Sequence, residues 1–171
     1  RGPMSFTIND ECGLLVDAFD RPPVLLMSYN PPYYAALLEG AGLVKCQDLF
    51  AYRMDVPDRV PERLAAAAAA VAGRGIAVRK LDFARCDEEV ERVHRIHSRA
   101  WAENWGAVPL TVEEMRALAA ELKPLADRDL VFLAEEAGEP VGVSVTVPDI
   151  HQALRLAHGR LLPFGLARIL W

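Results

Sequence analysis

The residues best suited to bind a small molecule lie in the segment AWAENWG, residues 100–106. Trp101 and Trp105 are four residues apart, Asn104 lies between them, and a glycine follows. An indole ring presents a broad apolar face and one N–H donor, and the exit of a helix is a common place for a binding site. The pair therefore indicates either core packing or an aromatic wall that lines a ligand site.

A second candidate lies in the segment NPPYY, residues 30–34. Tyr34 falls on the apolar face of a predicted helix, so we expect it in the core. Tyr33 lies about 100° further around the same helix and can carry its hydroxyl group toward a cleft. Tyr33 is therefore a candidate contact for a substrate.

Common catalytic and metal-binding motifs are missing from this sequence. There is no G-x-G-x-x-G, no G-x-x-x-x-G-K-[ST] and no G-x-S-x-G segment. His94 and His97 are three residues apart, but no glutamate accompanies them in the manner of a zinc protease. We therefore predict no metal site, with His97 packed partly against the core and His94 exposed. His151 and His158 are read as isolated histidines.

The bulk composition is that of a globular protein. Hydrophobic residues make up 52% of the chain, charged residues 25%, and the net charge is −5 without a basic face. These values argue against a nucleic-acid partner. No apolar run reaches the ~18–20 residues that span a bilayer, so we expect no membrane partner either. The acidic run 87–89 is expected to be the solvated start of a helix.

The cysteines and the chain ends bear on compartment and completeness. An odd number of cysteines without short spacing fits neither a disulfide framework nor a zinc site and favours a reducing, cytoplasmic location; they are Cys12, Cys46 and Cys86. Arg1 opens the chain, and residues 161–171 are strongly apolar. We therefore expect a piece of a longer protein, whose cut apolar surface favours self-association.

The first half of the sequence predicts a helix, a strand and a second helix. Asn30 is expected to cap a helix that starts at Pro31 and ends at Gly40 to Gly42. Apolar and polar residues alternate over 49–56, which predicts a half-buried strand. The alanine-rich run 57–73 predicts a linker helix. The short runs 12–16 and 24–28 are either buried strands or packed loop.

The second half predicts a strand, two helices, a strand pair and a short helix. The strand covers 76–82, and the first helix covers 87–105 with Gly106 after it. Thr111 and Glu114 form a capping box that opens a helix ending near Pro124. Strands over 129–136 and 139–147 are joined by a tight turn at Ala137-Gly138, with the odd-numbered valines of the second strand on one face. Asp149 is expected to cap a helix over 150–158.

This half resembles the opening of a GNAT-type N-acyltransferase, a fold that starts with a strand, two helices and an antiparallel strand pair. The step Glu139-Pro140-Val141-Gly142 looks like the opening of the third strand of that fold. The stretch AWAENWGAVPLTVEEM also resembles a group of bacterial GNAT-like proteins. The resemblance implies an α/β (α+β) fold, incomplete in this chain, with a mixed, mostly antiparallel sheet flanked by helices.

Residues 29–55 resemble the end of a GNAT domain, where a helix of the form N-x-x-A-x-x-x-Y-x-x-x-G-F precedes a last strand. Asn30, Gly42-Leu43 and the predicted strand 49–56 match that outline. The resemblance therefore implies a tandem arrangement. Residues 1–56 are the C-terminal part of an upstream domain, 57–75 are a linker helix, and 76–171 are the N-terminal part of a second domain.

Two departures from the GNAT pattern concern chemistry. Leu38 occupies the position where many members carry a tyrosine acid, and leucine cannot protonate a leaving thiolate. The acyl-CoA loop [QR]-x-x-G-x-[GA], whose amides hold a pyrophosphate at a helix N-terminus, is absent from residues 1–171. We therefore expect no tight cofactor binding by this chain and identify no catalytic residue from the sequence.

The resemblance implies transfer of an acetyl or other acyl group from acyl-CoA to an amine of a small molecule or protein. Because the exit of the first helix lines the acceptor cleft in this fold, Trp101, Asn104 and Trp105 are the expected acceptor contacts. Tyr33 and Asn9 are further candidates from the upstream domain. The alternative is a degenerate, non-catalytic GNAT-like module that binds a ligand or stabilises a partner domain.

Overall fold

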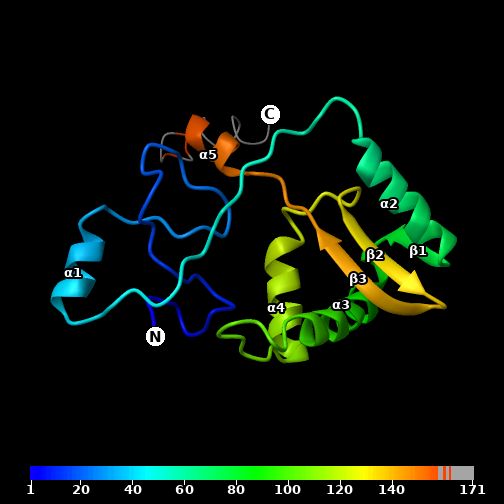
Figure 1. Ribbon diagram of the computed structural model, residues 1–171, viewed down its shortest axis with the longest axis horizontal. Coiled ribbons are helices and arrows are strands. Elements are labelled where there is room, and N and C mark those ends of the chain that lie inside the picture. Colours follow the sequence, from blue (N-terminus) through cyan, green and yellow to red (C-terminus); the bar gives the residue numbers. More distant parts are fainter. Residues whose placement is uncertain (158–159, 161, 163–171) are drawn as a thin grey trace. The chain divides into compact units, whose positions relative to one another are not determined.

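The computed structural model describes residues 1–157, 160 and 162 (Figure 1). The chain divides into two compact units, each of which we describe by itself. The helix–sheet unit comprises Ala51–Pro148, and the N-terminal unit comprises Arg1–Phe50 together with the chain from Asp149 onward. Among the described residues, no helix has the length and apolar character needed to cross a membrane.

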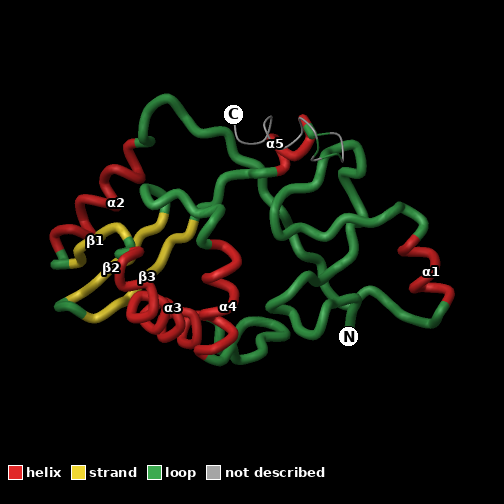
Figure 2. Tube along the Cα trace, turned by 180° about the vertical axis from the view of Figure 1, so that it is seen from behind, coloured by secondary structure: helices red, strands yellow, loops and turns green. Residues whose placement is uncertain are grey.

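The helix–sheet unit contains one antiparallel sheet of three strands in the order β1-β2-β3 (Figure 2). The predicted mixed α/β class, with an incomplete antiparallel sheet flanked by helices, is confirmed. The elements in chain order are α2 (Glu62–Gly73), β1 (Ile76–Lys80), the 3-10 helix η1 (Phe83–Arg85), α3 (Cys86–Ala100), α4 (Val112–Leu122), β2 (Val131–Glu136) and β3 (Glu139–Val145).

One face of the sheet packs against α3. Arg79, Leu133 and Val143 are paired across the three strands, so their side chains lie on the same face. Leu133 is fully buried, and Val90 of α3 and Met115 of α4 are buried as well. The small apolar core of this unit therefore lies between β2 and the two helices.

The β2–β3 hairpin closes with the predicted two-residue turn. Ala137 and Gly138 both have positive φ angles, 52° and 83°, which matches the right-handed twist of paired strands. A bulge then shifts the register, because Glu135 pairs with Pro140 while Ala134 pairs with Gly142. The predicted alternation of β3 is wrong at its start, since Pro140 is buried and Val141 is exposed.

Helix α4 begins with the predicted capping box. The Thr111 hydroxyl accepts a hydrogen bond from the Glu114 amide at 3.2 Å, and the Glu114 carboxylate accepts one from the Thr111 amide at 2.7 Å. These bonds satisfy backbone donors that no helical carbonyl can reach. Local sequence signals therefore fix the start of this helix.

The N-terminal unit has little regular structure among its described residues. It contains α1 (Tyr34–Gly40), α5 (His151–Leu156) and an isolated bridge between Met4 and Cys12. The runs 12–16 and 24–28 are loops without strands, as one of the two expected alternatives allowed. The Asp149 carboxylate accepts a hydrogen bond from the His151 amide at 3.1 Å, but the N-cap residue of α5 is Ile150, so the predicted cap at Asp149 is wrong by one residue.

The predicted start of α1 is wrong. Asn30 does not cap the helix, because its side-chain oxygen accepts from the Leu15 amide at 2.7 Å and its side-chain nitrogen donates to the Leu15 carbonyl at 3.2 Å. Asn30 and Pro31 both precede prolines, and a residue before proline is disfavoured in the helical region. The helix therefore begins only after Pro32. The Asn30 side chain is buried and links two loop segments through its hydrogen bonds to Leu15.

The predicted strand 49–56 is also wrong, since these residues form no strand. Tyr52 and Met54 are 89% and 84% exposed. An alternating pattern makes a strand only beside a neighbour that can share its backbone hydrogen bonds. Apart from Leu162, the apolar run 161–171 lies outside the described residues.

Candidate functional site

The aromatic loop, residues 101–110, connects α3 to α4 and carries all three acceptor contacts expected in this half of the chain (Figure 1). Helix α3 ends at Ala100, so its predicted extension to Trp105 is wrong. The loop makes turns instead, in which the Asn104 amide donates to the Trp101 carbonyl and the Ala107 amide donates to the Asn104 carbonyl, both at 3.0 Å. Asparagine favours turns, and Gly106 has a φ angle of 74° that suits glycine.

The two indole rings of the aromatic loop reach solvent. Trp101 is 53% exposed and Trp105 is 42% exposed, so neither belongs to the buried core. The Asn104 side chain between them is exposed as well. Of the two interpretations open for this segment, the exposed aromatic surface is therefore the one that its geometry favours.

His97 fixes the start of the aromatic loop. Its imidazole stacks on the Trp101 indole, with ring centroids 5.4 Å apart and an angle of 16° between the planes. The Nδ1 atom is buried and has no hydrogen-bond partner. Burial and the neighbouring His94 both lower the pKa of His97, which favours the neutral ring near pH 7. The expectation that His97 packs partly against the core agrees with this half-buried position.

His94 fixes the end of the loop. It was expected to be exposed, but it is half-buried, and its Nε2 atom lies 2.7 Å from the Leu110 carbonyl oxygen. Since a carbonyl only accepts, this contact places a proton on Nε2. One turn apart on α3, His97 and His94 therefore hold the two ends of the aromatic loop.

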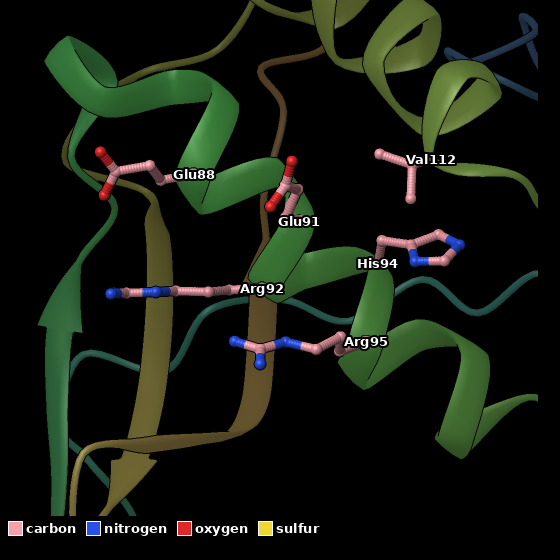
Figure 3. Close-up of a pocket in the computed structure, with 6 residues that line it drawn as sticks. All are labelled: Glu88, Glu91, Arg92, His94, Arg95 and Val112. Atoms are coloured by element: carbon pink, nitrogen blue, oxygen red, sulfur yellow. The ribbon is translucent and has the colours of Figure 1, made fainter.

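A charged groove of about 390 Å³ lies along α3 and the start of α4 (Figure 3). Arg92 and Arg95 project to the same side of α3, whereas His94 projects toward Val112. The lining residues are Glu88, Glu91, Arg92, His94, Arg95 and Val112. The carboxylate of Glu91 is neutralised by Arg116 at 2.6 Å, so the groove is a charged surface with mostly paired groups.

Sequence reasoning missed a group of four charged residues, the ion cluster, which holds α3 against the sheet. Arg79 of β1 donates two hydrogen bonds to Glu89 at 2.9 and 3.0 Å and one to Glu135 at 2.7 Å. Arg92 reaches the same two carboxylates at 3.2 and 3.4 Å. The hydrogen bond from Arg79 and the nearby positive charges lower the pKa of Glu135.

Glu89 is fully buried, so the expectation that the acidic run 87–89 is solvated is wrong for its third member. Glu89 precedes Val93 by four residues and thus lies on the inward side of α3. A carboxylate at such a position requires a cationic partner. That combination is the sequence signal that could have located the ion cluster.

The candidates of the N-terminal unit lie on exposed backbone. Tyr33 is 59% exposed, precedes α1 and packs edge-to-face on Tyr34, with ring centroids 5.0 Å apart. Tyr34 was expected in the core but is itself exposed. The Asn9 amide donates to the Thr7 hydroxyl within a turn. Tyr33 and Asn9 remain predictions as substrate contacts.

The described residues bear on two further kinds of site, a metal centre and an anion site at a helix start. No group of three or more His, Cys, Asp or Glu side chains there can hold a metal ion. The capping box places the Glu114 carboxylate at the start of α4, and α3 opens with three acidic residues, so negative charge disfavours an anion at both helix starts. The starts of α3 and α4 therefore do not favour a pyrophosphate group.

Two relatives match nearly the whole chain. A protein named bacterial ceramide synthase, from Caulobacter vibrioides (strain NA1000 / CB15N), is 42% identical over 170 residues, which are 99% of this chain and 44% of that protein. Protein YghO of Escherichia coli K12 is 34% identical over 170 residues, again 99% of this chain and 44% of the relative. The chain thus spans less than half the length of either relative. No protein-family model matches it, and neither does any solved structure.

Proposed function

We propose that this chain is part of an N-acyltransferase that joins the acyl group of a thioester to the amino group of a long-chain, lipid-like amine. The observation that carries the proposal is the 42% identity to the protein named bacterial ceramide synthase, which extends over 99% of this chain. A ceramide is the amide of a fatty acid and a long-chain amino alcohol. An enzyme that makes one forms an N-acyl bond.

The aromatic loop supplies the acceptor surface in this proposal. The exposed indoles of Trp101 and Trp105 offer apolar faces on which an alkyl chain can lie. Asn104, between them, carries both a donor and an acceptor for a hydroxyl or amino group. A surface that combines two large apolar faces with one amide suits an amphiphilic amine better than a small hydrophilic one.

The reaction itself requires a group that takes a proton from the acceptor. The acceptor ammonium must lose a proton before its nitrogen attacks the thioester carbonyl carbon. A C–N bond then forms, the nitrogen gives up a second proton, the C–S bond breaks, and the leaving thiolate takes up a proton in its place. We assign the proton acceptor to His97, because its pKa is lowered and its ring stacks on Trp101 at the proposed acceptor surface.

The His97 assignment predicts a pH profile. In His97→Gln, we expect kcat/KM to fall about a hundredfold or more, the usual contribution of a positioned base. In the unsubstituted protein, kcat/KM should decline as the pH falls through the lowered pKa of His97, below its ordinary value of 6.5. Steady-state kinetics between pH 5 and 8 measure both effects. An unchanged acidic limb in His97→Gln would assign the base elsewhere.

The acyl donor is the second substrate of the proposed reaction. The resemblance to GNAT-type enzymes suggests acyl-CoA as the donor, but the acidic residues at the starts of α3 and α4 disfavour its pyrophosphate there. We place the donor site in the part of the complete protein that corresponds to the unmatched length of the relatives. This proposal also includes a GNAT origin and a small-molecule amine as the acceptor. It further includes the tandem division of the chain into residues 1–56, 57–75 and 76–171.

A non-catalytic module is the competing proposal, and two observations favour it. Leu38 replaces the tyrosine acid of the resemblance. The acyl-CoA loop of the resemblance is also absent from residues 1–171. Such a module would bind the same acceptor through the aromatic loop without turnover, so binding and turnover separate the two proposals.

The test is an acyl-transfer assay on the complete protein. Purified protein is incubated with acyl-CoA of several chain lengths and either a long-chain amino alcohol or a short, water-soluble amine, and amide products are measured by mass spectrometry. We expect amide from the long-chain acceptor at a rate at least tenfold above that from the short amine. Binding of the long-chain amine without any amide product would favour the non-catalytic module, and equal rates would refute a lipid-like acceptor.

A further inference from the structure

We propose that the aromatic loop, together with Arg95 and Arg99 at the end of α3, is a docking surface for the headgroup region of an anionic lipid bilayer. This inference goes beyond the proposed acyl transfer, because it assigns the helix–sheet unit a lipid surface as a partner whether or not the protein is catalytic.

The apolar part of the surface consists of three side chains within eight residues. Trp101, Trp105 and Val108 are 53%, 42% and 42% exposed, and all three belong to the aromatic loop. The loop extends past the ends of α3 and α4, away from the sheet (Figure 1). Tryptophan is the residue that settles most readily at the interface between lipid headgroups and acyl chains, because its ring is apolar and its N–H can still bond to water or a headgroup.

The charged part of the surface lies on the last two turns of α3. Arg95 and Arg99 are four residues apart, so they lie on one side of the helix, and both are exposed. The other arginines of α3 and α4 are paired: Arg92 contacts Glu89 and Glu135, and Arg116 contacts Glu91 and Glu113. Among the described residues, no ion pair involves Arg95 or Arg99.

Charge complementarity selects the lipid as the occupant. Basic residues near an anionic bilayer are attracted to its surface, and indole insertion adds an apolar term. Glu103 is the one acidic residue within the aromatic loop, and the acids beside Arg95 on α3, Glu88 and Glu91, are paired with Arg85 and Arg116. A protein partner with an apolar patch would not require these unpaired arginines.

The sequence led us to expect no membrane partner, since no run of residues is long enough to span a bilayer. A peripheral contact does not need such a run. Because Trp101 stacks on His97 and His94 bonds to Leu110, both ends of the loop are held on α3. A loop that is already held in place loses little conformational entropy when it binds.

Vesicle flotation of the 171-residue chain tests the proposal, with no acyl donor or acceptor present. Vesicles contain either phosphatidylcholine alone or phosphatidylcholine with about a third phosphatidylglycerol. We expect binding to the anionic vesicles at least tenfold stronger than to the neutral ones, and weaker binding as salt is raised. Equal binding to both kinds of vesicle, or none to the anionic ones, would overturn the proposal.

Two pairs of matched variants locate the surface. Trp101→Ser/Trp105→Ser should reduce binding at least tenfold, while Phe50→Ser/Tyr52→Ser, which also removes two exposed aromatic rings, should leave it unchanged. Arg95→Gln/Arg99→Gln should reduce binding to anionic vesicles about tenfold. Its control, Arg59→Gln/Arg63→Gln, removes the same charge at exposed positions elsewhere. Equal losses in a variant and its control would contradict the assignment.

Tryptophan fluorescence provides a second measurement on a folded protein. The sequence has three tryptophans, Trp101, Trp105 and Trp171. In a Trp171→Phe background, emission therefore reports on the aromatic loop alone. We expect a blue shift on addition of anionic vesicles and quenching by brominated lipids. Unchanged emission while the protein floats with the vesicles would show that another surface binds. Catalysis can fail while this result stands, so the two proposals fail separately.

Discussion

The β2–β3 hairpin and the segment 49–56 have the same alternating pattern in the sequence and different structures. In the hairpin, Ala137-Gly138 returns the chain at once, and β1 supplies a second partner for β2. Segment 49–56 has no such turn beside it and remains outside any sheet. Alternation thus specifies which side chains share a face, but the backbone must also find a neighbouring strand.

The two units also differ in the contacts that stabilise them. In the helix–sheet unit, the ion cluster joins β1, β2 and α3, and Leu133 is buried beneath α3. In the N-terminal unit, Asn30 is the buried residue that ties Leu15 to the segment before α1. Breaking each of these contacts shows how independently the two units are stabilised.

The largest expected effect comes from Glu89→Ala. The substitution leaves Arg79 and Arg92 without the buried carboxylate that both contact, and breaking a buried ion pair typically costs about 3–5 kcal/mol. Urea unfolding followed by circular dichroism measures the change in free energy of unfolding. Glu88→Ala, an exposed neighbour, is the control and should change stability by less than about 0.5 kcal/mol. Equal effects of both substitutions would mean that the ion cluster does not hold α3.

A smaller effect is expected for Asn30→Ala. The Leu15 amide and carbonyl lose their side-chain partner, and an unsatisfied buried group costs about 1–3 kcal/mol. Hydrogen exchange should become faster at the Leu15 amide and remain unchanged at Leu133, because only the N-terminal unit is loosened. Faster exchange at both sites would show that the two units unfold together.

Thr111→Ala tests a local signal of the helix–sheet unit. Loss of the capping box should destabilise the protein by about 1 kcal/mol, because the Glu114 amide loses its acceptor. Thr111→Ser keeps the hydroxyl and is the matched control. The prediction fails if the serine variant loses as much stability as the alanine variant.

The smallest expected effect concerns the pH dependence of stability. Because the pKa of Glu135 is lowered in the folded protein, its contribution is present above its ordinary value of 4.5 and is lost as the pH falls through the lower, folded value. The free energy of unfolding should therefore decline less steeply between pH 5 and pH 3 in Glu135→Gln. The exposed neighbour Glu136 provides the control, and a Glu136→Gln variant with the same flattening would contradict the assignment.

The sequence was sufficient where a signal and its partner are close in the chain. The capping box of Thr111, the turn at Ala137-Gly138 and most of α3 are local, and each is confirmed. It failed where a distant residue decides the outcome. Asn30 bonds to Leu15 instead of capping α1, and Glu89 is buried by arginines, one of which lies ten residues earlier on β1.

The candidate site shows the same division. The types of Trp101, Asn104 and Trp105 and their position after α3 were evident from the sequence. The end of α3 at Ala100 was not, because turn formation at Asn104 and Gly106 competes with helix propensity over only five residues. The sequence did not predict that His97 stacks on Trp101 or that His94 bonds to the Leu110 carbonyl.

The most direct test of the central claim, that the aromatic loop is the acceptor surface of an N-acyltransferase, is the kinetics of Trp105→Ala in the complete protein. The acceptor is presented in detergent micelles, so that vesicle binding does not contribute, and Tyr52→Ala is the control. We predict an acceptor KM raised at least tenfold, an unchanged donor KM and a melting temperature within a few degrees of the unsubstituted protein. An unchanged acceptor KM together with a large loss of stability would return Trp105 to a structural role and contradict the account.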